Sequence, residues 1–242
     1  MSIKNTIGLL LLIAACTTEV RQPENVHVNQ EEEITPTPVV CHLEDSIRDA
    51  GLADVQFVNP DIRVYLRYST RNNFLKKDMY GCLDHAYLQT MAAQKLDTAQ
   101  QLLSEVDSNL HLLVWDAARP RSAQWKMWNT LQMPFNEKKR FVSNPKNGSI
   151  HNYGCAVDLT LCTSSGELLD MGTDFDYFGK AASASDEWEL VQEKVLTEEQ
   201  FDNRKLLRNV MLKAGFTTIN SEWWHFNAMS RPEASAAYAI LE

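Results

Sequence analysis

The chain has 242 residues, of which 44% are hydrophobic and 23% are charged, and its formal net charge at pH 7 is −9. This composition is typical of a globular protein with enough chain for one substantial hydrophobic core. Proteins that bind nucleic acids usually carry a basic patch, so the acidic balance argues against that class, and we expect no nucleic-acid partner.

The first sixteen residues have the pattern of a signal peptide. A lysine in MSIKN is followed by the apolar run TIGLLLLIAA and then by Cys16. The run is too short to cross a bilayer, and the sequence IAAC at its end resembles a bacterial lipobox, in which the cysteine becomes lipidated. We therefore expect residues 1–16 to be a lipoprotein signal peptide, with an ordinary secretory signal as the alternative. Lipidation of Cys16 predicts a protein anchored to a membrane in the periplasm or cell envelope.

The next segment, residues 17–40, has the composition of a tether. It holds five glutamates, one arginine and three of the chain's eight prolines, and its apolar residues have no helical period. Such a segment buries too little apolar surface to fold alone. We expect it to connect the anchor to one domain over residues 41–242, where the sequence has no internal repeat and no second low-complexity linker.

Four cysteines lie in the expected domain: Cys41, Cys82, Cys155 and Cys162. An oxidising compartment would allow them to pair in three ways. The sequence has no CxxC motif, which argues against a zinc knuckle. We favour a Cys41–Cys82 bridge, because these cysteines flank the first folded stretch, and we expect the other two to be buried thiols.

The predicted elements of this domain alternate irregularly between helix and strand. Apolar residues at helical spacing predict a helix over 86–106, and HLLVWD predicts a buried strand over 111–116. A helix is predicted after Pro120, followed by a turn-rich loop over 144–149 and a strand over 155–162. A further helix begins near a capping box at 197–200 and ends at Gly215, and an aromatic strand over 216–226 follows it. This order favours an α+β fold with a small central, mostly antiparallel sheet flanked by helices.

Potentially reactive side chains concentrate in SIHNYGCAVDLTL, residues 149–161. Gly154 permits a turn between His151 and Asp158, so the imidazole and the carboxylate can converge on one point. Together they suit a borderline cation such as zinc. The alternative is a structural His–Asp pair.

The stretch SEWWHF, residues 221–226, places an acid and an imidazole on either side of two tryptophans. Because Trp223 and Trp224 are costly to expose, we expect them to be buried behind and beside a water-poor site. Glu222 and His225 would point to opposite faces of an ideal strand. Glu222 must therefore lie at a bend before the strand if both side chains reach one site.

His151, Asp158 and His225 offer three protein ligands and leave a fourth position open, which is the catalytic pattern for zinc. Glu222 would then take a proton from zinc-activated water and deliver it to the leaving amine. In VWDAARPRS, Arg119 follows a buried strand and could stabilise a developing oxyanion. A surface ion pair between Arg119 and the aspartate of the same motif is the alternative.

Read together, these motifs resemble the zinc D-alanyl-D-alanine dipeptidases of the VanX type, part of a peptidoglycan metallopeptidase group that includes D-Ala-D-Ala carboxypeptidases and the Hedgehog domain. SIHNYGCAVD and SEWWHF match the metal motifs of that group. Further stretches between residues 55 and 230 resemble the dipeptidase branch in the family's order: VYLRYSTRNNF, VWDAARP, ELLDMGTDFD and NRKLLRNVMLKAGF. Agreement of so many stretches argues against coincidence.

The resemblance implies a single zinc-peptidase domain in which Zn²⁺ is held by His151, Asp158 and His225. It also implies that Glu222 is the catalytic base and that Arg119 stabilises the reaction intermediate. The chain departs from the family pattern in three places: Cys155 occupies a variable position inside the first metal motif, DAARP has alanines where the family more often has Gly-Tyr, and residues 179–200 are either a lid or a surface insertion.

The resemblance further implies that Tyr68 and Asp176 hold the substrate's free amino group and that Ser149 lies near its carboxylate. A clamp on the amino group suits a dipeptidase and has no use in a carboxypeptidase that acts on long stem peptides. We therefore expect hydrolysis of D-Ala-D-Ala to D-alanine in cell-wall turnover or salvage. The alternatives are a D-Ala-D-Ala or L,D-carboxypeptidase acting on stem peptides and a non-catalytic zinc-binding domain.

Overall fold

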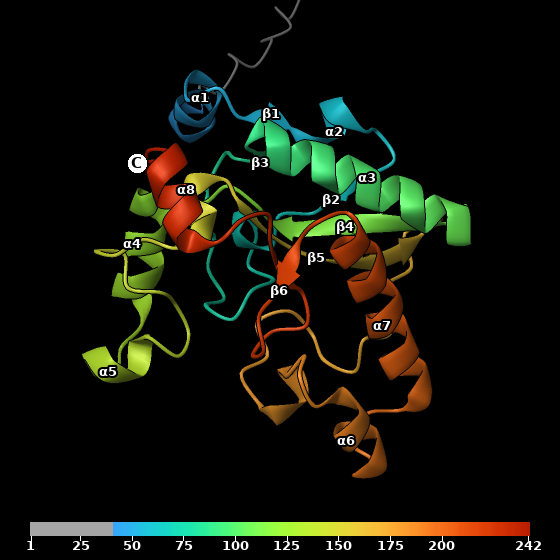
Figure 1. Ribbon diagram of the computed structural model, residues 1–242. Coiled ribbons are helices and arrows are strands. Elements are labelled where there is room, and N and C mark those ends of the chain that lie inside the picture. The colour runs from blue at the N-terminus through green and yellow to red at the C-terminus, as the bar shows by residue number, and fades with distance from the viewer. Residues whose placement is uncertain (1–40) are drawn as a thin grey trace, which may run out of the picture. The chain divides into compact units, whose positions relative to one another are not determined.

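The computed structural model describes residues 41–242 and confirms the α+β fold (Figure 1). The expected signal peptide, the lipidation site Cys16 and the tether over residues 17–40 lie outside the described residues. Within them, the strands form a two-stranded and a five-stranded sheet. The strands are β1 (Ala53–Asp54), β2 (Arg63–Val64), β3 (Tyr87–Leu88), β4 (Leu110–Asp116), β5 (Ala156–Thr163), β6 (Thr217–Thr218) and β7 (His225–Asn227).

Helices occupy much of the remaining described chain. The α-helices are α1 (His42–Asp49), α2 (Val55–Val58), α3 (Thr90–Val106), α4 (Arg121–Thr130), α5 (Phe135–Lys138), α6 (Glu187–Gln192), α7 (Glu198–Lys213) and α8 (Arg231–Ala237). The short 3-10 helices are η1 (Arg67–Ser69), η2 (Ile150–Tyr153) and η3 (Lys180–Ala182). Across residues 41–242, no helix combines the length and the apolar character needed to cross a membrane.

The five-stranded sheet has the order β2-β4-β5-β7-β6, and only the β2–β4 pair is parallel. The register of β4 and β5 places Asp116 opposite Asp158, and the register of β5 and β7 places Asp158 opposite His225. Three titratable residues from three strands therefore form one row across the sheet. A β-bulge lies between Val114 and Asp116, where such a bulge can redirect a side chain.

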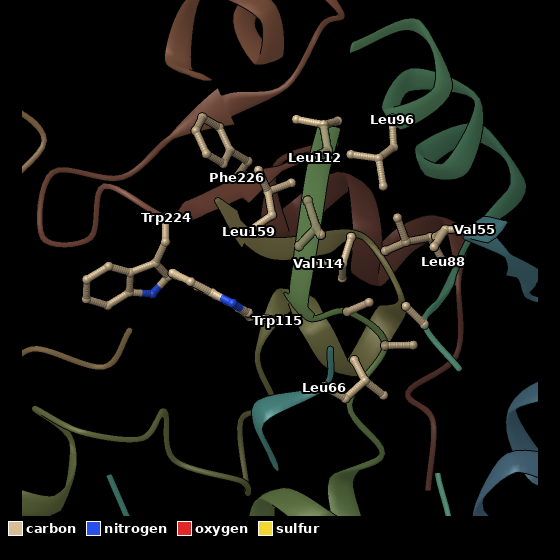
Figure 2. Close-up of a cluster of buried hydrophobic side chains, with 14 of the residues drawn as sticks. Val55, Leu66, Leu88, Leu96, Leu112, Val114, Trp115, Leu159, Trp224 and Phe226 are labelled. Carbon is tan, nitrogen blue, oxygen red and sulfur yellow. The ribbon is translucent and has the colours of Figure 1, made fainter. Parts of the chain in front are cut away.

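The hydrophobic core lies between the sheet and the helices α3 and α7, which contact the sheet and each other. Figure 2 shows Leu96 of α3, Leu112 and Val114 of β4 and Phe226 of β7 in one cluster, and all four are fully buried. Burying a side chain of this kind stabilises the fold by about 1.5–3 kcal/mol. The core thus fixes the strands that carry the row of titratable residues.

Four predicted elements are confirmed with small shifts in their ends: the strand over 111–116 as β4, the helix after Pro120 as α4, the strand over 155–162 as β5 and the late helix as α7. The capping box of α7 is formed, since Gln200 N donates to Thr197 Oγ1 at 3.1 Å and Thr197 N donates to Gln200 Oε1 at 2.9 Å. Gly215 follows the helix with a φ of 87°, as expected of a residue that ends it.

The helix predicted over 86–106 begins only at Thr90. Tyr87 and Leu88 form β3 instead, because their backbone groups pair with β1 in an antiparallel ladder. Leu88 is apolar because it is fully buried in this strand, and its spacing from the apolar residues of α3 only happens to match a helical pattern. Strand pairing therefore overrides the helical pattern at its N-terminal end.

The single strand predicted over 216–226 is wrong. β6 and β7 are separate short strands, and residues 220–224 between them form a bend and a turn. Asn220 and Trp223 in this bend form backbone hydrogen bonds with residues 182–184, and only Trp224, next to β7, bonds to β5 through Leu159. Glu222 lies in the bend before β7, which is the position required if it is to share a site with His225.

The structure confirms the Cys41–Cys82 disulfide, which ties the chain before α1 to the loop that precedes β3. Cys155 and Cys162 are free and buried, as expected. Cys155, inside the first metal motif, is therefore a buried thiol, and within residues 41–242 it forms no disulfide that would constrain the backbone of this motif.

Candidate metal centre and active site

His151 lies in η2, immediately before β5, and its direction depends on the glycine that ends this turn. Gly154 has a φ of 67°, a region that favours glycine. A Cβ atom at this position would lie 2.6 Å from Leu52 Cδ2 and 3.3 Å from the backbone nitrogen of Gln89. The tight turn therefore needs Gly154, and it directs the buried His151 towards the strand that carries Asp158.

Three side-chain acceptors converge where η2, β5 and β7 meet. His225 Nδ1 lies 2.8 Å from Asp158 Oδ1, and His151 Nε2 lies 3.2 Å from His225 Nδ1 and 3.4 Å from Asp158 Oδ1. All three residues are buried, and their potential ligand atoms lie within 4.8 Å of one another. This group could hold a metal ion.

Hydrogen bonds on the far side of each imidazole fix which ring nitrogen is free to bind a cation. His151 Nδ1 lies 2.8 Å from the carbonyl oxygen of Ala117, and His225 Nε2 lies 2.9 Å from Asn227 Oδ1. Because these oxygens accept, they keep protons on those nitrogens, and the lone pairs of His151 Nε2 and His225 Nδ1 face Asp158. Three acceptors so close together repel unless a cation lies among them, so the donor set fits a metal ion.

The pKa values of His225 and Asp158 likewise show that a positive charge stabilises this cluster. Burial lowers the pKa of His225, but its hydrogen bond with Asp158 and the nearby charges outweigh burial and raise it to about 9. Burial raises the pKa of Asp158, but the two histidines outweigh it and hold that pKa well below its ordinary value. A proton or a metal ion beside the carboxylate satisfies this demand.

Glu222 lies at the edge of this cluster, with Oε2 3.9 Å from His225 Nδ1. Its side chain is 35% exposed, so the carboxylate lies between the buried cluster and solvent. Burial raises the pKa of Glu222 above its ordinary value, against the opposing effect of His225. A raised pKa makes this carboxylate a stronger base, as a group that accepts a proton from water requires.

Arg119 and Asp116 do form the ion pair considered from the sequence, but the pair is buried rather than on the surface. Arg119 Nε donates to Asp116 Oδ2 at 3.0 Å, and Arg119 Nη2 lies 3.8 Å from Asp158 Oδ2. Asp116 also accepts from the Tyr80 hydroxyl at 2.5 Å. Burial lowers the pKa of Arg119, but Asp116 outweighs it and raises that pKa, so the guanidinium stays charged beside the cluster.

Tyr68 and Asp176 form a hydrogen-bonded pair, in which the tyrosine hydroxyl lies 3.0 and 3.1 Å from the two carboxylate oxygens. The guanidinium of Arg119 lies over the Tyr68 ring, 5.2 Å from its centroid. Asp176 has a φ of 58°, which few residues other than glycine adopt. Burial and the charge of Asp158 raise the pKa of Asp176 well above its ordinary value, so a cation beside it would favour its ionised form.

Ser149 belongs to a buried network that links α4 to η2. Its hydroxyl donates to Gln124 Oε1 at 2.9 Å, and Asn152 Nδ2 donates to the same oxygen at 2.9 Å. Asn152 Nδ2 also donates to the carbonyl oxygen of Arg119 at 2.7 Å. Gln124 and Asn152 could not be recognised from the sequence, because a single amide on a helix or in a turn carries no distinctive signal.

The eight residues singled out from the sequence for the site line one cavity of about 260 Å³: Tyr68, Arg119, Ser149, His151, Asp158, Asp176, Glu222 and His225. The cavity is also lined by residues that the sequence analysis missed, including Asn227 and the cations Lys139, Arg140 and Arg231. Asn227 follows His225 by two residues on β7, and this same-face spacing is the signal that could have found it.

The two tryptophans between Glu222 and His225 are buried, as expected, with exposures of 3% and 1%. The Trp223 indole nitrogen donates to Thr173 Oγ1 at 2.7 Å, and the two indole rings meet edge to face at 5.5 Å. Figure 2 shows Trp224 beside the core cluster. The described residues that line the cavity include neither tryptophan, so both belong to the packed interior next to Glu222 and His225 in the chain.

Comparisons with known proteins agree with this arrangement. A family model described as D-ala-D-ala dipeptidase (Peptidase_M15) matches residues 48–240. The D-alanyl-D-alanine dipeptidase of Escherichia coli (strain K12) is 34% identical over 193 residues, which cover 78% of this chain and 89% of that relative. Proteins of the same name from Enterococcus faecalis (strain V583) and Enterococcus faecium are each 28% identical over 186 residues, covering 71% of this chain and 88% of each relative. The chain belongs to the D-Ala-D-Ala dipeptidase family of peptidases.

Proposed function

We propose that this protein is a zinc-dependent dipeptidase that hydrolyses D-Ala-D-Ala to D-alanine. The observation that carries the proposal is the convergence of three acceptors from His151, Asp158 and His225 in one cavity with Glu222 and Arg119. The relatives named D-alanyl-D-alanine dipeptidase support the same substrate.

Zn²⁺ held by the three acceptors would polarise a carbonyl group and lower the pKa of a water molecule. Glu222, close to His225, accepts a proton from the attacking water and delivers it to the amine that leaves. Arg119 is held in place by Asp116 and offers its guanidinium to the negative charge that develops on the carbonyl oxygen.

A free dipeptide carries a charged group at each end, and the cavity offers a partner to both. The ammonium group would stabilise the ionised form of Asp176, while the Tyr68 hydroxyl fixes the direction of that carboxylate. Ser149 and the cations Lys139 and Arg231 suit the carboxylate end. A cavity of about 260 Å³ that offers a partner to each end favours a dipeptide over a long stem peptide.

The test is release of D-alanine from D-Ala-D-Ala by the purified protein, before and after chelation and after zinc is restored. We expect release that chelation abolishes and zinc recovers. Release of D-alanine only from a stem pentapeptide that ends in D-Ala-D-Ala would instead support a carboxypeptidase. Binding of zinc without turnover of either substrate would support a non-catalytic domain.

We also propose that the enzyme is anchored outside the cytoplasm through a lipid on Cys16, where it would serve wall turnover or salvage. The lipobox-like sequence before Cys16 supports this location, as does the Cys41–Cys82 disulfide, because such bonds persist in oxidising compartments. A Cys16→Ser variant should lose incorporation of labelled fatty acid and leave the membrane fraction. Labelling of that variant at the wild-type level would contradict the anchor.

A further inference from the structure

A second hollow, of about 470 Å³, adjoins the catalytic cavity, and the two share Arg140 and Glu222 as lining residues. One wall of the hollow comes from the chain between Asp176 and α6, and the other comes from the bend at residues 220–222. The hollow therefore adjoins the catalytic cavity at Glu222, the carboxylate that we assign as the general base. The hollow is larger than the catalytic cavity. The catalytic cavity already holds the protein groups that suit both ends of a dipeptide.

The walls of this hollow offer apolar contact. Tyr177 and Phe178 are 47% and 37% exposed, and the fully buried Leu190 of α6 also lines the hollow. The Phe178 ring packs edge to face on Phe141 at 4.5 Å, and Phe141 lines the catalytic cavity. An aromatic surface thus runs from one space to the other.

Two of the four charged groups that line the hollow have protein partners, and the other two, Arg140 and Glu222, lie where the hollow adjoins the catalytic cavity. Lys180 donates to the Glu193 carboxylate at 2.6 and 2.8 Å, and Asp186 accepts from the Ser185 hydroxyl at 2.7 Å. Pairing of these groups lowers their demand for a polar ligand. The hollow therefore suits an apolar side chain more than a charged one.

Hydrogen bonds hold the two walls in place. Ala184 N donates to the carbonyl oxygen of Asn220 at 2.9 Å, and Trp223 N donates to the carbonyl oxygen of Ala182 at 3.0 Å. The buried Arg204 of α7 donates to the carbonyl oxygens of Ala181 and Met171 at 2.9 and 2.6 Å. Residues 179–200 were expected to be either a lid or a surface insertion. At residues 181–184 this segment is held in place by hydrogen bonds and forms a fixed wall of the hollow.

The position of the hollow relative to the proposed clamp groups identifies the end of the substrate that it adjoins. Its lining includes Tyr177, directly after Asp176, and Glu222, which acts at the scissile bond, together with Arg140, which it shares with the catalytic cavity. The described lining does not include Ser149, which we place near the carboxylate end. The hollow therefore lies beside the amino-terminal residue of a bound dipeptide.

We propose that this hollow receives the side chain of the substrate's amino-terminal residue, so that the enzyme hydrolyses D-dipeptides with a large apolar first residue as well as D-Ala-D-Ala. The inference rests on the proposed function, because it takes the direction of the substrate from the assigned clamp residues. It identifies residues 177–190 as the part of this chain that widens its substrate range.

The test compares kcat/KM for D-Ala-D-Ala, D-Phe-D-Ala and D-Ala-D-Phe. For wild type we expect the value for D-Phe-D-Ala to lie within about tenfold of that for D-Ala-D-Ala, since an open apolar pocket discriminates weakly against added methylenes. A Ser185→Trp variant fills the hollow with an indole, and it should lower the ratio of D-Phe-D-Ala to D-Ala-D-Ala turnover about tenfold or more. Ser165→Trp places the same side chain on an exposed turn outside both spaces and should keep the wild-type ratio.

The outcomes separate this inference from the proposed function. Absence of D-Ala-D-Ala turnover by zinc-loaded wild type would overturn the proposed function itself. Turnover of D-Ala-D-Ala with D-Phe-D-Ala more than about a hundredfold poorer would overturn only the inference. An unchanged ratio in Ser185→Trp, or a loss confined to D-Ala-D-Phe, would likewise show that the hollow does not hold the amino-terminal side chain.

Discussion

The choice of ring nitrogen on His151 and His225 decides whether these residues can share a cation. Each imidazole is held from behind, by the Ala117 carbonyl oxygen and by Asn227 Oδ1, so that its free lone pair faces Asp158. The backbone carbonyl cannot be removed by mutation, but the amide of Asn227 can. Asn227 is therefore the accessible test of how far this outer support contributes to metal binding.

Asn227→Ala should weaken zinc binding by about 10–100-fold, because loss of an outer partner frees the His225 ring to change tautomer and orientation. The measurement is zinc affinity by competition with a chromogenic chelator, at a pH well above the range in which His225 is protonated. Asn129→Ala, on an exposed position of α4, is the matched control and should bind zinc as wild type does. Equal affinities for the two variants would remove Asn227 from the metal centre.

Glu222→Gln should keep zinc but lower kcat for D-Ala-D-Ala by about 10²–10⁴-fold, because the amide cannot accept a proton from water. The change preserves size, and the residue is partly exposed, so the fold should tolerate it. Steady-state kinetics together with metal content checks the prediction. The same change at Glu105, which is exposed near the end of α3, is the control. Activity of zinc-loaded Glu222→Gln near the wild-type level would require another base.

At the scale of elements, the short turn η2 and the glycine that ends it set the position of the metal centre. The chain must turn back within a few residues to place a buried imidazole beside β5. Gly154 meets this need through its positive φ, and it also lies against Leu52 and Gln89. Gly81 has nearly the same φ, of 68°, but no atom lies within 4 Å of a Cβ built on it, so the two glycines form a matched pair.

Gly154→Ala should destabilise the protein more than Gly81→Ala does. The positive φ costs either variant about 1–2 kcal/mol, and crowding against Leu52 adds about 1–3 kcal/mol at Gly154 alone. Urea denaturation of both variants measures the difference in the free energy of unfolding. Only Gly154→Ala should also weaken zinc binding, because His151 precedes it in the same turn. Equal stability losses would show that Leu52 moves aside without cost.

The elements that could be predicted from the sequence are those whose pattern is local. β4, β5 and α7 carry continuous apolar runs, alternation or a capping box, and each formed close to its predicted place. The predictions failed where backbone groups pair with a distant part of the chain. β3 pairs with β1 at the start of a helical pattern, and Asn220 and Trp223 bond to residues 182–184 instead of extending a strand. No local pattern contains those partners.

At the scale of the whole molecule, the site is assembled from segments far apart in the chain. His225 meets Asp158 across 67 residues and meets His151 across 74, and the meeting depends on the order of strands in the sheet. The residue types of the site could be predicted because their motifs resemble a known family. Asn227, Gln124 and the adjoining hollow could not, because only the assembled sheet and the wall at residues 177–190 bring them into place.

The same assembly makes the stability of the zinc-free protein depend on pH through His225. Its pKa in the folded protein is raised from an ordinary value of 6.5 to about 9 by its partner Asp158, although burial alone would lower it. A folded pKa above the unfolded one means that folding favours the protonated form. This stabilisation is fully present below about pH 6.5 and is lost as the pH rises through about 9.

We therefore expect the free energy of unfolding of chelator-treated protein to fall between pH 6.5 and about 9, as measured by urea denaturation. His85 also has a raised pKa and contributes in the same direction from an exposed position, so the wild-type curve alone does not isolate His225. A His225→Asn variant removes the buried contribution and should show a shallower fall over this range. Zinc should flatten the wild-type curve, because a bound cation replaces the proton beside Asp158. Parallel curves for zinc-free wild type and His225→Asn would mean that the buried imidazole carries no linked proton, and the charge balance of the metal centre would have to lie elsewhere.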